Sequence, residues 1–100
     1  KNYPTQYMSN SHYFDSKFVK LPLLLRKWKR GDKIIPFGMK GSKLISDILI
    51  DKKISNFDKR NVIVICDADD KIISVIGHTS ANFTRLTSAT TKIIEISWIY

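Results

Sequence analysis

The chain has 100 residues, enough for one compact domain with a modest core but too few for a nucleotide-binding catalytic domain together with a second module. Hydrophobic residues make up 43% of it, which is ordinary for a globular domain and argues against long disorder, and fifteen isoleucines favour strands over helices. The formal net charge of +8 at pH 7 points to a negatively charged partner.

The single cysteine, Cys66, lies in an apolar run, so the chain forms no internal disulfide and no cysteine-based metal site. We therefore expect a reducing, cytoplasmic location. No apolar stretch is long enough to span a bilayer and no signal-peptide layout is present, so no membrane role is expected. The start at Lys1 rather than at methionine suggests a fragment of a longer protein.

Positive charge is concentrated in residues 17–43. This segment has nine basic side chains and one acid, Asp32, whereas the rest of the chain, including Lys71 and Lys92, has eight bases and eight acids. A one-sided cluster of this kind is typical of a surface for a polyanion, with nucleic acid first and anionic lipid second. The alternative is a basic face that only keeps the protein soluble.

Glycine and proline residues mark the boundaries between segments in the first half of the chain. Residues 1–16 are polar and aromatic and are expected to form a lead-in or linker, with room for a short strand. The run Phe18–Trp28 favours a strand, and Pro22 within it favours an edge or a bend. Residues 30–42 hold three glycines and a proline, which predicts an exposed, shaped loop.

Two helices are predicted after this loop. Ser42 is expected to cap the first, which has one apolar stripe within residues 44–49. Ser55 and Asp58 have the spacing of a capping box, which predicts a short helical turn near Phe57–Arg60.

Strand patterns dominate the second half. The apolar runs 62–65 and 72–76 flank a polar segment and predict a β-hairpin, and apolar alternation through residues 94–100 predicts a last strand with one buried face. The predicted fold class is therefore α+β, with a small, mainly antiparallel sheet or sandwich, one principal helix and a short second helical turn. We expect one domain over residues 17–100.

Catalytic and metal-binding patterns are weak. The aspartates of residues 67–70 do not make a calcium loop, because Ile72 stands where a glycine is needed. His12 and His78 are isolated and lack metal-ligand spacing. We therefore expect no catalytic residue, no metal and no cofactor in this domain.

Two features offer a way to bind phosphates or bases. Lys40 and Lys43 lie beside a helix that is expected to begin near Lys43, and the free N–H groups at the start of this helix would suit a phosphate. A capped turn with solvated lysines is an equally good interpretation. Trp28 and Phe37 have the chemistry to stack on unpaired bases, but packing is the commoner use of such side chains.

Residues 23–50 read LLLRKWKRGDKIIPFGMKGSKLISDILI. The segment contains an arginine, then a short stretch rich in basic residues, then Gly-Asp-Lys, Pro-x-Gly-Met and a lysine before Ser-Asp. The residues of this pattern are Arg26, Gly31, Asp32, Lys33, Pro36, Gly38, Met39, Lys43, Ser46 and Asp47. This pattern resembles the C-terminal domain of tRNA(Ile)-lysidine synthetases, and the similarity covers about residues 14–100. One departure follows Gly77, where the family commonly has an arginine and this chain has His78.

The resemblance implies a bacterial parent ligase that uses ATP, with magnesium, to attach lysine to the wobble cytidine of an isoleucine tRNA. The SGGxDS-type ATP loop of that family does not occur here, so ATP, magnesium and lysine are expected to bind outside this chain. The implied partners are the acceptor-stem side of the isoleucine tRNA and the parent's own N-terminal catalytic domain. A homodimer of the parent is a further option.

The implied role of this domain is to grip the tRNA far from the reacting base. Asp32 is expected to fix its turn through local hydrogen bonds rather than to contact RNA. The alternatives are a related domain of the phenylalanyl-tRNA synthetase β subunit and a protein-interaction or dimerisation module. The residues expected to contact tRNA phosphates are Arg26, Lys29, Arg30, Lys33, Lys40 and Lys43.

Overall fold

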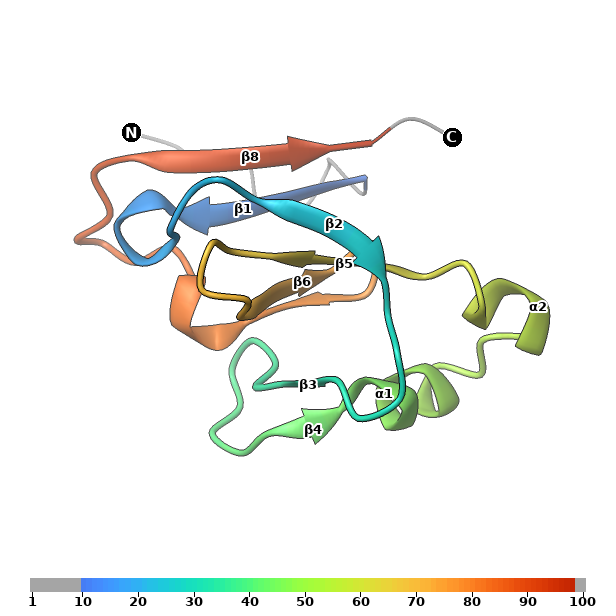
Figure 1. The fold of residues 1–100 in the computed structure, drawn as a ribbon. Coiled ribbons are helices and arrows are strands. Elements are labelled where there is room, and N and C mark those ends of the chain that lie inside the picture. The colour runs from blue at the N-terminus through green and yellow to red at the C-terminus, as the bar shows by residue number, and fades with distance from the viewer. Residues whose placement is uncertain (1–9, 99–100) are drawn as a thin grey trace.

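Three layers of secondary structure stack on one another in residues 10–98, the part of the chain that the computed structural model describes (Figure 1). The outer layer is the antiparallel pair of β1 (Ser11–Asp15) and β8 (Ile93–Ser97). The middle layer is an antiparallel sheet with the strand order β2-β5-β6-β7. Its strands are β2 (Leu24–Lys27), β5 (Ile63–Cys66), β6 (Ile72–Val75) and β7 (Thr79–Ser80).

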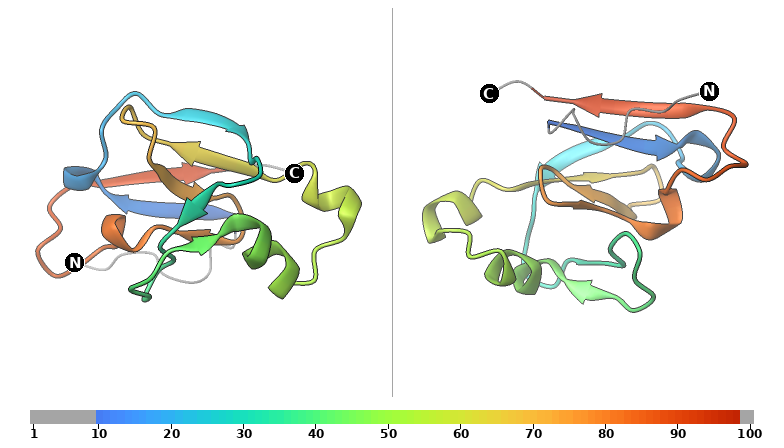
Figure 2. Two further views of the ribbon diagram at one scale, coloured as in Figure 1. Left: turned by 60° about the horizontal axis from the view of Figure 1, so that its bottom comes forward. Right: turned by 180° about the vertical axis from the view of Figure 1, so that it is seen from behind.

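The third layer contains a two-stranded hairpin and the longer helix. The hairpin pairs β3 (Lys33–Ile34) with β4 (Lys43–Leu44), and α1 (Ile45–Asp51) follows directly. The short helix α2 (Asn56–Lys59) projects beyond one end of the layers, as both orientations of Figure 2 show.

Two short 3-10 helices complete the described elements. They are η1 (Ser16–Phe18) and η2 (Asn82–Thr84).

Each face of the middle sheet covers its own apolar core. On β5, Val64 and Cys66 face the third layer, whereas Ile65 faces β1 and β8, because side chains alternate along a strand. A strand buried on both faces needs a continuous apolar run, which explains the sequence of this segment. The first core contains Ile34, Ile45, Ile48, Leu49, Val62, Val64, Cys66, Val75 and Ala81, and the second contains Phe14, Val19, Ile65 and Ile73.

The register of β6 shifts opposite the end of β5. Ile65 pairs with Ser74 and Cys66 pairs with Ile72, so Ile73 is the extra residue of a β-bulge. The bulge lets Ile72 pack against the first core while Ile73 lies in the second.

The predicted α+β class is confirmed, with antiparallel sheets and one main helix. The predicted hairpin corresponds to β5 and β6, and the last predicted strand corresponds to β8, although Tyr100 lies outside the described residues. The predicted helical turn is α2, and the Ser55 hydroxyl accepts a hydrogen bond from the N–H of Asp58 at 3.1 Å.

The strand allowed for in the lead-in is β1. It forms hydrogen bonds to β8 and supplies the buried Phe14 to the second core, so residues 11–15 are part of the folded unit. Residues 1–9 of the lead-in lie outside the described part of the chain. The domain boundary at residue 17 stays a prediction.

Two expectations were wrong. The strand expected over Phe18–Trp28 is confined to Leu24–Lys27, which is an edge strand as Pro22 indicated. Ser42 does not cap α1, because Lys43 and Leu44 pair with β3 and the helix begins only at Ile45. The loop expected over residues 30–42 contains β3 and a bridge from Pro36 to Ala81.

Candidate nucleic-acid interface

A tight turn connects β2 to β3 and carries the basic residues of the Gly-Asp motif. Gly31 has a φ of +94°, a backbone conformation that glycine adopts without steric cost. The Asp32 carboxylate accepts the N–H of Lys29 at 2.8 Å, and the Asp32 carbonyl accepts the N–H of Ile45 at 2.9 Å. The Asp32 carboxylate therefore fixes this turn, as expected from the sequence, and the Asp32 carbonyl also holds the start of α1, which was not expected.

Arg26 on β2 forms a two-pronged ion pair with Asp32. Its two terminal nitrogens lie 2.9 and 3.2 Å from the carboxylate oxygens, and the side chains are only 24% and 7% exposed. Burial alone would raise the pKa of Asp32, but the hydrogen bonds from Arg26 and from the Lys29 amide outweigh it and lower the pKa. The same pairing raises the pKa of Arg26.

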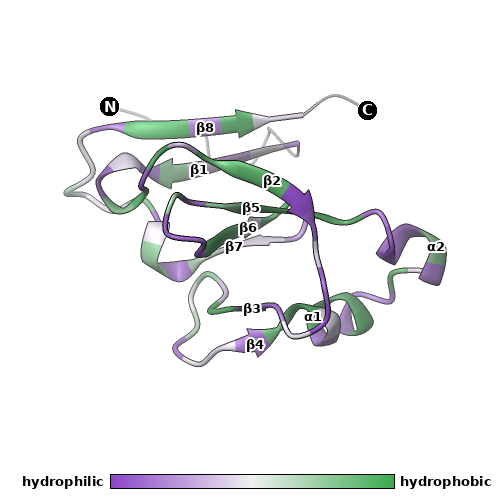
Figure 3. Cartoon of the chain, viewed as in Figure 1, coloured by the Kyte–Doolittle hydropathy of each residue, from purple (hydrophilic) through white to green (hydrophobic). Residues whose placement is uncertain are grey.

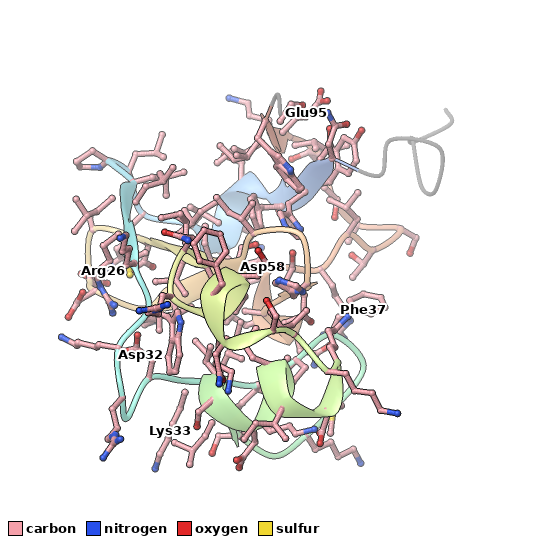
Figure 4. The ribbon with its side chains drawn as sticks, turned by 90° about the vertical axis from the view of Figure 1, so that its right-hand side faces the viewer. Arg26, Asp32, Lys33, Phe37, Asp58 and Glu95 are labelled. Carbon is pink, nitrogen blue, oxygen red and sulfur yellow. The ribbon has the colours of Figure 1, made fainter. Side chains whose placement is uncertain are left out.

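A groove of about 430 Å³ opens beside this ion pair. Figure 4 shows Arg26, Asp32 and Lys33 along one side of the molecule and Phe37 on the opposite side. The hydrophilic stretch that runs from the end of β2 toward β3 in Figure 3 forms one wall. The lining residues are Arg26, Lys29, Gly31, Asp32, Lys33, Ile34, Ile35, Ser42, Asp70, Lys71, Ile72, Ala81 and Phe83.

The groove is also lined by the turn between β5 and β6 and by η2. The Lys71 ammonium lies 5.4 Å from the centroid of the Phe83 ring, and Asp70 precedes it in the turn. The sequence grouped Lys71 with the neutral remainder, and that grouping was wrong, because the fold places it in the groove with Lys29 and Lys33.

Residues 23–98 match the family described as the TilS substrate C-terminal domain. The chain belongs to this family. The match begins one residue before β2 and includes every residue that lines the groove.

Several relatives of this TilS C-terminal domain are tRNA(Ile)-lysidine synthases. The chain is 34% identical over 98 residues to the tRNA(Ile)-lysidine synthase of Parabacteroides distasonis, of which it covers 22%. It is 38% identical over 81 residues to that of Bacteroides thetaiotaomicron and 40% identical over 70 residues to that of Bacillus subtilis, of which it covers 19% and 15%. The chain therefore spans about a fifth of the length of these relatives.

Solved structures agree with the fold. A crystal structure of a TilS C-terminal domain superposes with a TM-score of 0.77 at 25% identity, over 99% of this chain and 79% of that one. An N-terminal fragment of the phenylalanyl-tRNA synthetase β subunit of Pyrococcus horikoshii has a TM-score of 0.74 at 21% identity, over 85% of this chain and 26% of that one. The second likeness shows a shared fold only.

The expected contact residues of this TilS C-terminal domain divide into groups. Arg26, Lys29 and Lys33 line the groove, and Arg30 is exposed in the same turn. Within residues 10–98, no carboxylate forms an ion pair with Lys29, Arg30 or Lys33. These three side chains therefore present their charge to solvent.

Lys40 and Lys43 lie differently. Lys40 is exposed in the segment between β3 and β4 and does not line the groove. Lys43 forms an ion pair with Asp51 and lines a separate groove of about 230 Å³ beside Met39 and Lys52. The helix expected to begin near Lys43 begins at Ile45, whose N–H already donates to the Asp32 carbonyl, and Lys43 itself is in β4. The phosphate cradle at this helix start stays a prediction.

The two expected aromatic side chains also differ from each other. Trp28 packs against the first core and its indole N–H donates to the Lys59 carbonyl at 2.6 Å, so its role is structural. Phe37 is 63% exposed and lines a third groove with His12 and His78.

The His12 ring on β1 is held by contacts to Gly77 and to Ser80 of β7. Its Nε2 accepts the N–H of Gly77 at 3.0 Å, its Nδ1 lies 3.0 Å from the Ser80 hydroxyl, and the Trp98 ring packs against it. Burial, together with nearby His78, lowers the pKa of His12 from 6.5 to about 4. Burial also lowers the pKa of His78.

Other site types receive no support in the described part of the chain. Residues 10–98 contain no group of three or more side chains placed to hold a metal ion. The helices there are too short and too polar to cross a membrane.

Proposed function

We propose that this chain is the tRNA-binding domain of a longer bacterial tRNA(Ile)-lysidine synthase, a cytoplasmic ligase that attaches lysine to the wobble cytidine of an isoleucine tRNA. The observation that carries the proposal is the basic groove in a chain of this family. ATP, magnesium and lysine bind to the remainder of that protein.

The charges of the groove support a grip on a phosphate backbone. Lys29, Arg30 and Lys33 lie in or directly after a turn that the Arg26–Asp32 pair fixes, and Lys71 lines the same groove from the turn between β5 and β6. An RNA stem exposes mainly phosphates and ribose hydroxyls, so a fixed set of cations suits it. Arg26 contributes chiefly by positioning this turn.

Lys40 and Lys43 extend the contact along the third layer. Lys43 must release Asp51 to bind a phosphate, and because the Asp51 side chain is 61% exposed, this release costs little. The acceptor-stem side of the tRNA is the proposed target, and contacts made there hold the distant cytidine in register with the catalytic domain.

The edge of β2 is the proposed contact with the parent's own catalytic domain. Leu21, Leu24 and Leu25 are 64%, 56% and 53% exposed at this edge, which suits burial against another protein surface. A homodimer of the parent through the same edge is the second candidate.

Charge reversal in the groove tests the proposal. We expect Lys29→Glu with Lys33→Glu to weaken binding of isoleucine tRNA at least tenfold, because two phosphate contacts become repulsive. The control is Lys53→Glu with Lys92→Glu, which reverses two exposed cations outside the groove. Filter binding of labelled tRNA measures both, and equal losses would refute a specific basic groove.

A further inference from the structure

The groove has features that a grip on phosphates does not require. Its floor is apolar and is formed by Ile34, Ile72 and Ala81. Its rim carries the Phe83 ring and the aliphatic side chain of Ile35, and these residues are 37% and 41% exposed. A paired RNA stem keeps its bases stacked inside and offers no apolar surface to such a floor. An unpaired nucleotide offers the flat face of its base.

Phe83 is placed to receive that face. The ring lies on η2 at the rim, and the partner that the structure gives it is the ammonium of Lys71, 5.4 Å from the ring centroid. Lys71 is itself exposed, so a base can take its place on the ring at little cost, and the displaced ammonium stays beside the same groove. Stacking on an aromatic side chain is the usual way in which proteins hold unpaired bases.

The distribution of charge orients the nucleotide. Lys29 and Lys33 come from the β2–β3 turn and the strand that follows it, Phe83 comes from η2, and Asp70 precedes Lys71 in the turn between β5 and β6. Because Asp70 offsets Lys71 in the β5–β6 turn, a phosphate is drawn more strongly toward Lys29 and Lys33 at the β2–β3 turn. Asp32 does not oppose this, because Arg26 and the Lys29 amide already engage its oxygens.

We propose that this groove holds one unpaired nucleotide of the bound RNA, with its base stacked on Phe83 and its phosphate near Lys29 and Lys33. The proposal rests on the RNA-binding function proposed above and adds the kind of RNA structure that is bound. A groove of about 430 Å³ lies in the size range of small-ligand sites, roughly 300–1,000 Å³, whereas a duplex can only bridge it.

Two RNA probes separate the two proposals. One is a short blunt RNA duplex, and the other is the same duplex with a single-stranded overhang. We expect the chain to bind both, because the cations grip the stem, and to bind the overhang probe about tenfold more tightly, because one base stacks. Fluorescence anisotropy of labelled probes gives both affinities.

Phe83→Leu removes the flat ring and keeps an apolar side chain of similar size. We expect it to lower the affinity for the overhang probe to that for the blunt duplex and to leave the blunt duplex unchanged. The matched control is Phe57→Leu, which replaces a ring that is 68% exposed on α2, away from the groove. The control should keep the full advantage of the overhang.

Phe83→Trp provides a readout that does not depend on losing a side chain. Its indole should keep the preference for the overhang, and its fluorescence should be quenched by the overhang probe and not by the blunt duplex. Absence of that quenching, or an overhang preference that survives Phe83→Leu, would overturn the unpaired-nucleotide site while leaving RNA binding intact. Failure of both probes to bind would instead refute the RNA-binding function and this inference with it.

Discussion

Asp32 of the Gly-Asp motif and Arg26, six positions before it, have different roles. Asp32 was expected to fix a turn, and its carboxylate does so by accepting the N–H of Lys29. Arg26 was expected to bind phosphate, but both of its terminal nitrogens engage Asp32. The sequence indicates that both charges are present, whereas their pairing depends on how β2 aligns with the turn.

Asp32→Ala should destabilise the fold by about 2 kcal/mol, because it leaves Arg26 half-buried without its partner and removes the acceptor of a backbone N–H. For a domain of this length, that corresponds to a fall in Tm of roughly 10 °C. Thermal unfolding followed by circular dichroism measures it.

The control is Asp69→Ala, which removes the exposed pair with Lys20, whose side chains are 71% and 45% exposed. It should cost no more than about 0.5 kcal/mol, since exposed pairs contribute little. Similar losses for the two variants would show that burial does not strengthen the Arg26 pair.

His12 predicts a pH dependence of stability. Its pKa of about 4 in the folded chain is below the ordinary 6.5, so the unfolded chain binds a proton more readily between these values. The stability that comes from neutral His12 is therefore complete above about pH 6.5 and is lost as the pH falls toward 4. We expect Tm to decline over this window, with most of the decline absent in His12→Gln. An undiminished decline in the variant would assign the effect to other groups, His78 first.

Local elements were predictable where one chemical signal decides the structure. The capping box at Ser55 identified α2, and two apolar runs around a polar segment identified β5 and β6. Ser42 was likewise predicted to cap a helix, but it does not, because Lys43 and Leu44 pair with β3 and the helix begins only at Ile45. That pairing depends on the tertiary structure, which the local sequence pattern does not reveal.

Substituting the two serines tests this difference. Ser55→Ala should cost about 1 kcal/mol, because the Asp58 amide loses its acceptor. Ser42→Ala should change the free energy of unfolding by less than about 0.5 kcal/mol, since the hydroxyl caps no helix. Urea unfolding measures both, and a larger loss at Ser42 would restore the cap that the sequence suggested.

At the scale of the whole molecule, the groove joins segments that are far apart in sequence. The turn after β2 was visible as a basic cluster, but Lys71 and Phe83 come from the β5–β6 turn and from η2. No local sequence pattern indicates that these two residues belong to a site, because Lys71 lies in a predicted hairpin of neutral net charge and Phe83 follows the stretch that departs from the family pattern. The stacking of the three layers (Figure 1) brings their segments together, and the two side chains line one groove with Lys29 and Lys33.

The salt dependence of RNA binding tests the central claim, which is that a rigid cationic groove grips a phosphate backbone. With about four to six phosphate contacts, the logarithm of the association constant should fall with the logarithm of salt concentration at a slope of roughly 3 to 5. Lys29→Gln with Lys33→Gln should reduce that slope by about 1.5 to 2. A flat salt response of the unsubstituted chain, or a slope that these two substitutions leave unchanged, would contradict the claim.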